Sequence, residues 1–127
     1  MQKGRRLWPS NKLSAKIRFV VAWIPCYHEY MIKSFHNKGT EDIFNGINSK
    51  EARKLCPRSI WNIATRKLDQ LDSVRSIEEL RIPPGNMLEA LKVERKGQYS
   101  IRINEQYRIC FKWLPTGPCA VEITDYH

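Results

Sequence analysis

The last forty residues constrain the fold most, because apolar and polar residues alternate there in three successive segments. The segments are Tyr99–Ile103, Tyr107–Trp113 and Cys119–Tyr126. Successive side chains of a strand point to opposite faces of a sheet, so each segment predicts a strand with one apolar and one polar face. The connections at 104–106 and 114–118 are short enough for hairpins, which predicts an antiparallel meander.

The apolar face of this meander needs a cover, and the preceding residues predict helices that supply it. We expect helices at Thr40–Asn45, where Thr40 acts as the cap, at Ser49–Leu55, in a longer segment after Pro57, and in one turn at Ser76–Leu80. The longer helix carries apolar residues at helical spacing: Ile60, Ile63, Ala64, Leu68 and Leu71. Short strands are expected at Met31–Phe35 and Met87–Leu91, and a loop at Pro83–Asn86. The predicted fold class is α+β, with N-terminal helices packed on one face of a small antiparallel sheet.

Charge and composition narrow the function classes. The 127 residues include 22 Lys+Arg against 13 Asp+Glu, a net charge of +9, which favours an anionic partner such as nucleic acid. No apolar run approaches the roughly 20 residues that span a bilayer, so a membrane protein is not expected. Four cysteines without a C-x-x-C pair and only three histidines make a structural zinc site improbable and fit a reducing cytoplasm.

Residues 1–30 differ from the rest, since they carry a net charge of +5 and a short apolar stretch at Phe19–Ile24. One interpretation is a signal peptide with a basic start. Against it, the apolar stretch is short, contains Trp23 and lacks a small-residue cleavage site. We favour a basic N-terminal extension outside the core, with Met31 as a candidate start and 31–127 as the domain.

The polar face of the predicted meander gathers cations. Simple registration places Arg102, Arg108, Lys112 and Tyr126 on it, and the preceding loop adds Lys92, Arg95 and Lys96. Several cations with a tyrosine on an open sheet suit an RNA backbone and a stacked base. An ordinary solvated face is the commoner meaning of such a pattern, and both interpretations stay open on composition alone.

The chain closes with Asp125, Tyr126 and His127, which directly continue the last predicted strand. Such residues are usually a frayed end. Held at a sheet edge, however, a carboxylate, a phenol and an imidazole that titrates near neutral pH form an acid–base set for phosphodiester chemistry without a metal.

Long collinear blocks in residues 31–127 resemble HigB-type toxins of the RelE/ParE superfamily. The blocks are M-I-K-S-F with K-G (31–39), R-K-L-D-Q-L (66–71), P-P-G-N (83–86), R-K-G-Q-Y-S-I-R-I-N (95–104), Q-Y-R-I-C-F (106–111) and V-E-I-T-D-Y-H (121–127). The resemblance implies a compact antiparallel sheet with helices on one face. It also implies a messenger-RNA endonuclease acting on translating ribosomes, neutralised by a HigA-like helix-turn-helix antitoxin that represses the shared operon.

The resemblance also implies roles for individual residues. The catalytic cluster carries onto Asp125, Tyr126 and His127, and phosphate-contacting positions carry onto Lys92 and Arg108. Glu89 stands where many relatives have a histidine, and we treat it as a further catalytic candidate. Val93 replaces a usual glycine, and a β-branched residue resists the positive φ that glycine accepts, so we expect a shifted loop around Lys92. Met87 replaces a usual arginine.

These observations give one leading hypothesis and two alternatives. The leading hypothesis is a cytoplasmic, metal-independent and cofactor-free mRNA endonuclease whose partners are the antitoxin, the ribosome and mRNA. Operator DNA would be reached only through the antitoxin complex. The alternatives are a non-catalytic module that binds antitoxin or ribosome, and a gyrase poison of the ParE kind on the same fold.

Overall fold

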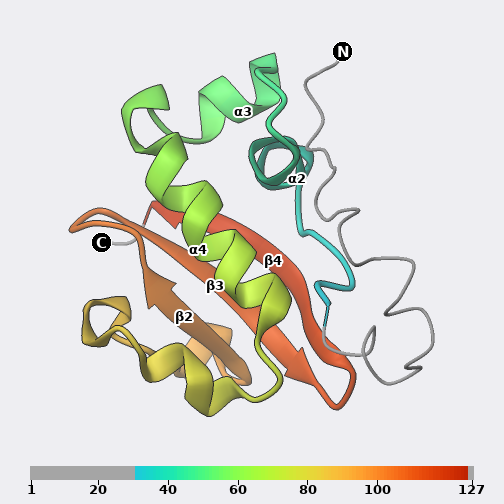
Figure 1. The fold of residues 1–127 in the computed structure, drawn as a ribbon, viewed down its shortest axis with the longest axis vertical. Coiled ribbons are helices and arrows are strands. Elements are labelled where there is room, and N and C mark those ends of the chain that lie inside the picture. The colour runs from blue at the N-terminus through green and yellow to red at the C-terminus, as the bar shows by residue number, and fades with distance from the viewer. Residues whose placement is uncertain (1–30, 126–127) are drawn as a thin grey trace.

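The computed structural model describes residues 31–125, in which helices precede a sheet (Figure 1). The helices are α2 (Lys38–Asn45), α3 (Lys50–Leu55) and α4 (Trp61–Ser73). The strands are β1 (Glu89–Ala90), β2 (Gln98–Arg102), β3 (Tyr107–Leu114) and β4 (Gly117–Asp125). Short 3-10 turns lie between them: η2 (Arg58–Ile60), η3 (Ile77–Arg81), η4 (Pro84–Asn86) and η5 (Val93–Arg95). The predicted α+β class is confirmed. The apolar stretch at 19–24 and residues 126–127 lie outside the described residues.

The sheet is an antiparallel meander in the order β1-β2-β3-β4. Its three longer strands match the three alternating segments, and β1 is shorter than the strand expected at 87–91. The strand expected at 31–35 runs beside β4 and pairs through one parallel bridge, Phe35 with Val121. Two backbone bonds flank that bridge: His36 N donates to Val121 O at 2.8 Å, and Val121 N donates to Ser34 O at 3.1 Å. The segment therefore borders the sheet without forming a full strand.

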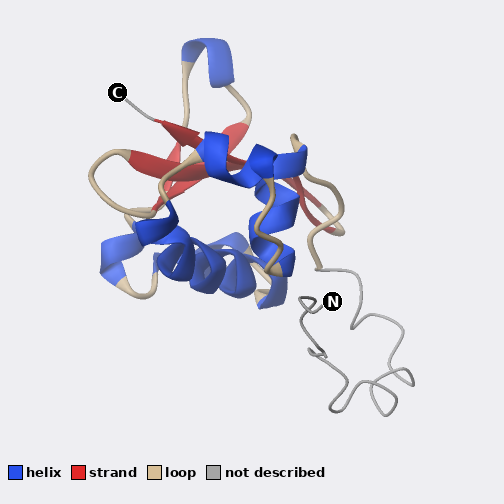
Figure 2. Cartoon of the chain, turned by 90° about the horizontal axis from the view of Figure 1, so that it is seen from above, coloured by secondary structure: helices blue, strands red, loops and turns tan. Residues whose placement is uncertain are grey.

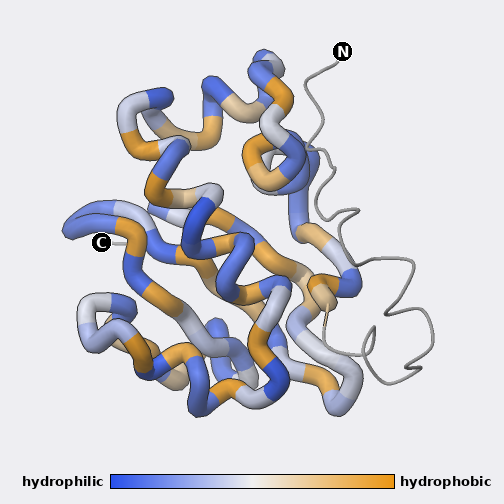
Figure 3. Tube along the Cα trace, viewed as in Figure 1, coloured by the Kyte–Doolittle hydropathy of each residue, from blue (hydrophilic) through white to orange (hydrophobic). Residues whose placement is uncertain are grey.

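The core lies between the helices and one face of the sheet. In Figure 1, α4 crosses the strands diagonally, and Figure 2 shows the larger helices together on one side of the sheet. Leu68 and Leu71 of α4 are fully buried against the same cluster as Ile109 and Phe111 of β3. Figure 3 shows hydrophobic residues recurring along α4 and along the strands beneath it. The predicted stripe on α4 is confirmed, although the helix begins at Trp61, one short turn after Pro57.

The predicted cap of the first helix is wrong, because Asn37 caps α2 instead of Thr40. The side-chain oxygen of Asn37 accepts from Thr40 N at 3.0 Å. Thr40 is fully buried; its hydroxyl donates to Asn37 Oδ1 at 2.7 Å and accepts from Ile123 N at 3.0 Å. The hydroxyl thus ties α2 to β4, a role that its position in the sequence does not reveal. Ser76 also forms no side-chain cap bond at η3.

Candidate functional site

The sheet face opposite the helices carries the predicted cations. The strand register pairs Arg102 with Arg108 and Gln98 with Lys112, so the three basic side chains share one face. Ser100, Cys110, Glu122 and Thr124 lie on it as well. The turn η5 stands on this side of the sheet, which Figure 2 shows as a short helical turn away from the larger helices. The predicted grouping of Arg102, Arg108 and Lys112 is confirmed.

Arg108 is the most constrained of these cations. Only 8% of it is exposed. Its Nε donates to Ser100 Oγ at 2.7 Å, and its Nη2 donates to the Met87 carbonyl at 2.6 Å. A buried guanidinium keeps its charge only where such acceptors replace water. Arg108 is therefore a fixed positive charge set into the sheet, not the solvated side chain that strand alternation alone suggests.

Glu89 lies beside Arg108 and remains accessible. It pairs with Ser100 across β1 and β2, and its Oε1 is 3.6 Å from Arg108 Nη2. Its side chain is 54% exposed. The structure therefore brings together two predicted site residues that are 19 positions apart, one a fixed cation and the other a carboxylate open to solvent.

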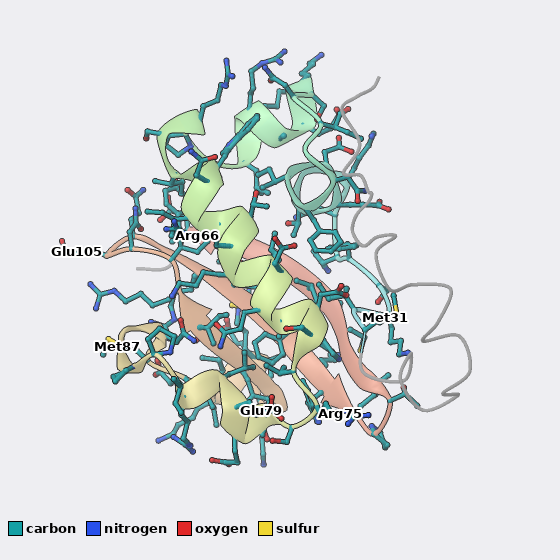
Figure 4. The ribbon with its side chains drawn as sticks, viewed as in Figure 1. Met31, Arg66, Arg75, Glu79, Met87 and Glu105 are labelled. Carbon is teal, nitrogen blue, oxygen red and sulfur yellow. The ribbon has the colours of Figure 1, made fainter. Side chains whose placement is uncertain are left out.

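The turn at Met87 links two arginines. Met87 adopts a left-handed backbone with φ 47°, and its side chain is half-exposed. Its carbonyl accepts from Arg108, and its sulfur accepts from Arg102 Nη1 at 3.0 Å. Arg102 Nε also donates to the Asn104 carbonyl at 3.1 Å. Figure 4 shows Met87 at the outer edge of the turn that precedes β1. The residue that replaces a usual arginine thus helps to hold the two arginines of the sheet.

The basic loop before β2 divides its cations into two kinds. Lys92 and Lys96 are exposed. Arg95 instead donates to Gln98 Oε1 at 3.0 Å and lies 3.5 Å from Glu122 Oε1. Glu122 lies on the polar side of β4, and its role as a counter-charge to Arg95 depends on how the loop folds over the sheet.

Val93 adopts a left-handed backbone conformation, which the glycine usual at this position would accept without strain. Its φ is 54°, and 85% of the residue is exposed. A β-branched side chain in the left-handed region is strained. We expected valine to shift the loop around Lys92, yet Val93 itself keeps the left-handed backbone that glycine would accept.

Asp125, the last described residue, lies on a different face from Arg108. The register pairs it with Tyr107, whose side chain belongs to the core, whereas Arg108 pairs with Thr124. Asp125 accepts from Gln106 Nε2 at 3.0 Å and is exposed at the end of β4. Burial, with a smaller contribution from the Asp125 carboxylate, raises the pKa of Tyr107. Tyr126 and His127 lie outside the described residues.

Among residues 31–125, no group of three His, Cys, Asp or Glu side chains is placed to hold a metal ion. No helix there is both long and apolar enough to cross a bilayer. Cys56, Cys110 and Cys119 are free thiols.

Comparison with known proteins agrees with this architecture. A family model described as "RelE-like toxin of type II toxin-antitoxin system HigB" matches residues 33–127. Toxin HigB-1 of Vibrio cholerae serotype O1 is 40% identical over 84 residues, covering 66% of this chain and 85% of the relative. An uncharacterized protein of Haemophilus influenzae is 40% identical over 57 residues, covering 45% of this chain and 56% of the relative. The chain belongs to the HigB-like family of RelE-like toxins of type II toxin–antitoxin systems.

Proposed function

We propose that this toxin is an endoribonuclease that cuts messenger RNA on the ribosome and so stops translation. The observation that carries the proposal is the pairing of buried Arg108 with accessible Glu89. A guanidinium held in place before substrate arrives can stabilise charge without reorganising. An exposed carboxylate beside it can reach a substrate hydroxyl. Exposed Lys92, Lys96 and Lys112 add the positive surface that an RNA backbone requires.

The reaction proposed is a transesterification within the RNA strand. A base removes the proton of a 2′-hydroxyl, the oxygen attacks the adjacent phosphorus in line, and the bond from phosphorus to the 5′-oxygen breaks. An acid protonates the departing 5′-oxygen, which leaves a cyclic phosphate on one fragment and a hydroxyl on the other. Arg108 and Lys92 stabilise the negative charge that develops on the phosphate. In this proposed reaction, protein side chains supply the base, the acid and the positive charge, and no metal ion or cofactor is needed.

Glu89 is the base that the geometry favours, because it shares the face of Arg108 while Asp125 pairs with core-facing Tyr107. Proton transfer to the leaving oxygen is assigned to His127 or Tyr126, whose side-chain chemistry suits it. Asp125 is then an orienting group at the strand end. Arg95, paired with Glu122, contributes to the shape of the loop as well as to its charge.

A type II toxin is paired with an antitoxin, and we propose a HigA-like helix-turn-helix protein for this role. The complex, and not the toxin alone, would bind operator DNA. We further propose that 31–127 is the active domain and that the toxin works in the cytoplasm, where ribosomes and mRNA are found.

Primer extension on cellular mRNA after induced expression tests the activity, and single-turnover cleavage of ribosome-bound mRNA tests the residues. Glu89→Gln and His127→Gln should each lower the rate constant by about 10²–10⁴-fold, the usual contribution of general acid–base catalysis. Glu105→Gln is the matched control, since Glu105 is exposed at the tip of the β2–β3 hairpin (Figure 4). Broken DNA with intact mRNA would instead identify a gyrase poison, and inhibition without any cleavage a binding module.

A further inference from the structure

Asn86, in the turn before β1, is a fully buried polar side chain with a complete set of partners. Its Nδ2 donates to Leu80 O at 3.0 Å and to Gln70 Oε1 at 3.1 Å. Its Oδ1 accepts from Lys67 Nζ. Gln70 also donates to Ile82 O at 2.7 Å. Two side chains of α4, Lys67 and Gln70, thus hold the segment 80–86 through Asn86 and the Ile82 carbonyl.

Lys67 occupies an unusual place for a lysine on a helix. Its ammonium lies between α4 and the η4 turn, where burial lowers its pKa, and the neighbouring positive charge of Arg66 lowers it further. Lysines on amphipathic helices ordinarily extend into water. The partner here is a neutral amide oxygen, so the contact fixes Asn86 rather than neutralising a charge.

The residue after Asn86 connects this network to the candidate site. Met87 turns into the left-handed region, and its carbonyl accepts from Arg108 Nη2 at 2.6 Å. Arg108 in turn donates to Ser100 and faces Glu89. A continuous series of contacts therefore runs from α4, on the core side of the sheet, to the guanidinium on the opposite face.

We propose that Lys67 and Asn86 are positioning residues for Arg108. They hold the η4 turn so that the Met87 carbonyl meets the guanidinium, and that contact sets its orientation beside Glu89. The proposal rests on the function proposed above, in which Arg108 stabilises the phosphate. Small displacements of such a group matter, since an error of about 1 Å can lower a rate by about 10²-fold.

Single-turnover cleavage with toxin in saturating excess over ribosome-bound mRNA, together with far-UV circular dichroism, separates positioning from folding. The circular dichroism spectrum reports the folded fraction, while the rate constant reports the geometry of the folded site. Lys67→Met should lower the rate constant by about tenfold at unchanged ribosome affinity. Arg66→Met, which removes an exposed charge from the same helix, is the matched control. In an Arg108→Ala background, Lys67→Met should have no further effect, because the positioned group is gone.

Hydrogen exchange of the Arg108 Nη2–H, which donates to the Met87 carbonyl, is followed by NMR and tests the positioning without reference to activity. Lys67→Met should speed this exchange, whereas Arg66→Met and the donor-retaining Lys67→Arg should leave it slow. If Lys67→Met fails to fold, the shorter Lys67→Gln replaces it, with the same expected acceleration.

Unchanged exchange in a folded Lys67 variant would overturn the proposal, as would equal losses of rate constant with and without Arg108. If the parent protein cleaves no mRNA, the proposed function fails, and the exchange measurement still decides whether Lys67 positions Arg108.

Discussion

Replacing Val93 by glycine should stabilise this toxin, although most substitutions destabilise a protein. Val93 lies at φ 54° in the η5 turn. For an L-residue the left-handed region costs roughly 1–2 kcal/mol, and branching at Cβ adds to the crowding. Because 85% of Val93 is exposed, removing its side chain sacrifices little apolar burial.

The size of the effect follows from two opposing contributions. Glycine relieves the strain but gains about 0.5–1 kcal/mol of unfolded-state entropy that folding must overcome. The net rise in the free energy of unfolding should be about 1 kcal/mol, which corresponds to roughly 4 °C in Tm for a domain of this size. Val93→Asn should give a similar gain, because asparagine tolerates the left-handed region without glycine's extra freedom.

Urea unfolding of the parent and three variants at position 93 measures this. The expected order of stability is glycine and asparagine above alanine, with valine at or below alanine. Alanine is the control, since it removes the branch and keeps a Cβ. A glycine variant no more stable than the alanine variant would refute the assignment of strain to the left-handed backbone.

Thr40→Val keeps the shape of the side chain but leaves the buried Ile123 N–H without its acceptor, so the free energy of unfolding in urea titrations should fall by about 1–3 kcal/mol. An unchanged free energy of unfolding would show that the hydrogen bond between α2 and β4 does not stabilise the fold. Burial raises the pKa of Cys56 to about 11, so iodoacetamide at pH 8 should alkylate partly buried Cys119 before Cys56 in peptide mass spectra; equal labelling of the two would show that the core around Cys56 opens. Deleting 1–30 should leave circular dichroism, Tm and ribosome-dependent cleavage unchanged, and an insoluble truncated chain would make the extension structural.

Local patterns predicted the parts of the fold whose physics is local. Alternation identified β2, β3 and β4, because a two-residue repeat can bury one face only as a strand. The same alternation assigns Asp125 to the face of Ile123 and Arg108 to the opposite one. The apolar spacing located α4, whereas valine in place of a usual glycine led us to expect a shifted loop, and Val93 keeps a left-handed backbone instead.

Where the local sequence allows two equally good arrangements, contacts between distant segments decide which one forms. Asn37 and Thr40 are both residue types that favour the N-cap of a helix. Asn37 is the cap here because the Thr40 hydroxyl accepts a hydrogen bond from Ile123 N–H, which is 83 positions away in the sequence. By sequence alone, Arg95 is one more cation of a basic loop. In the structure it lies 3.5 Å from the Glu122 carboxylate of β4, which is a counter-charge that the loop sequence does not indicate.

The candidate site shows the same division most clearly. Strand alternation alone places Arg108 on the polar face of β3, since Tyr107 and Ile109 must face the core. The burial of the guanidinium depends on tertiary contacts, because its acceptors come from a turn 21 positions earlier and from the neighbouring strand. A strand pattern sets the direction in which a side chain points, whereas its partners depend on which distant segment packs over it.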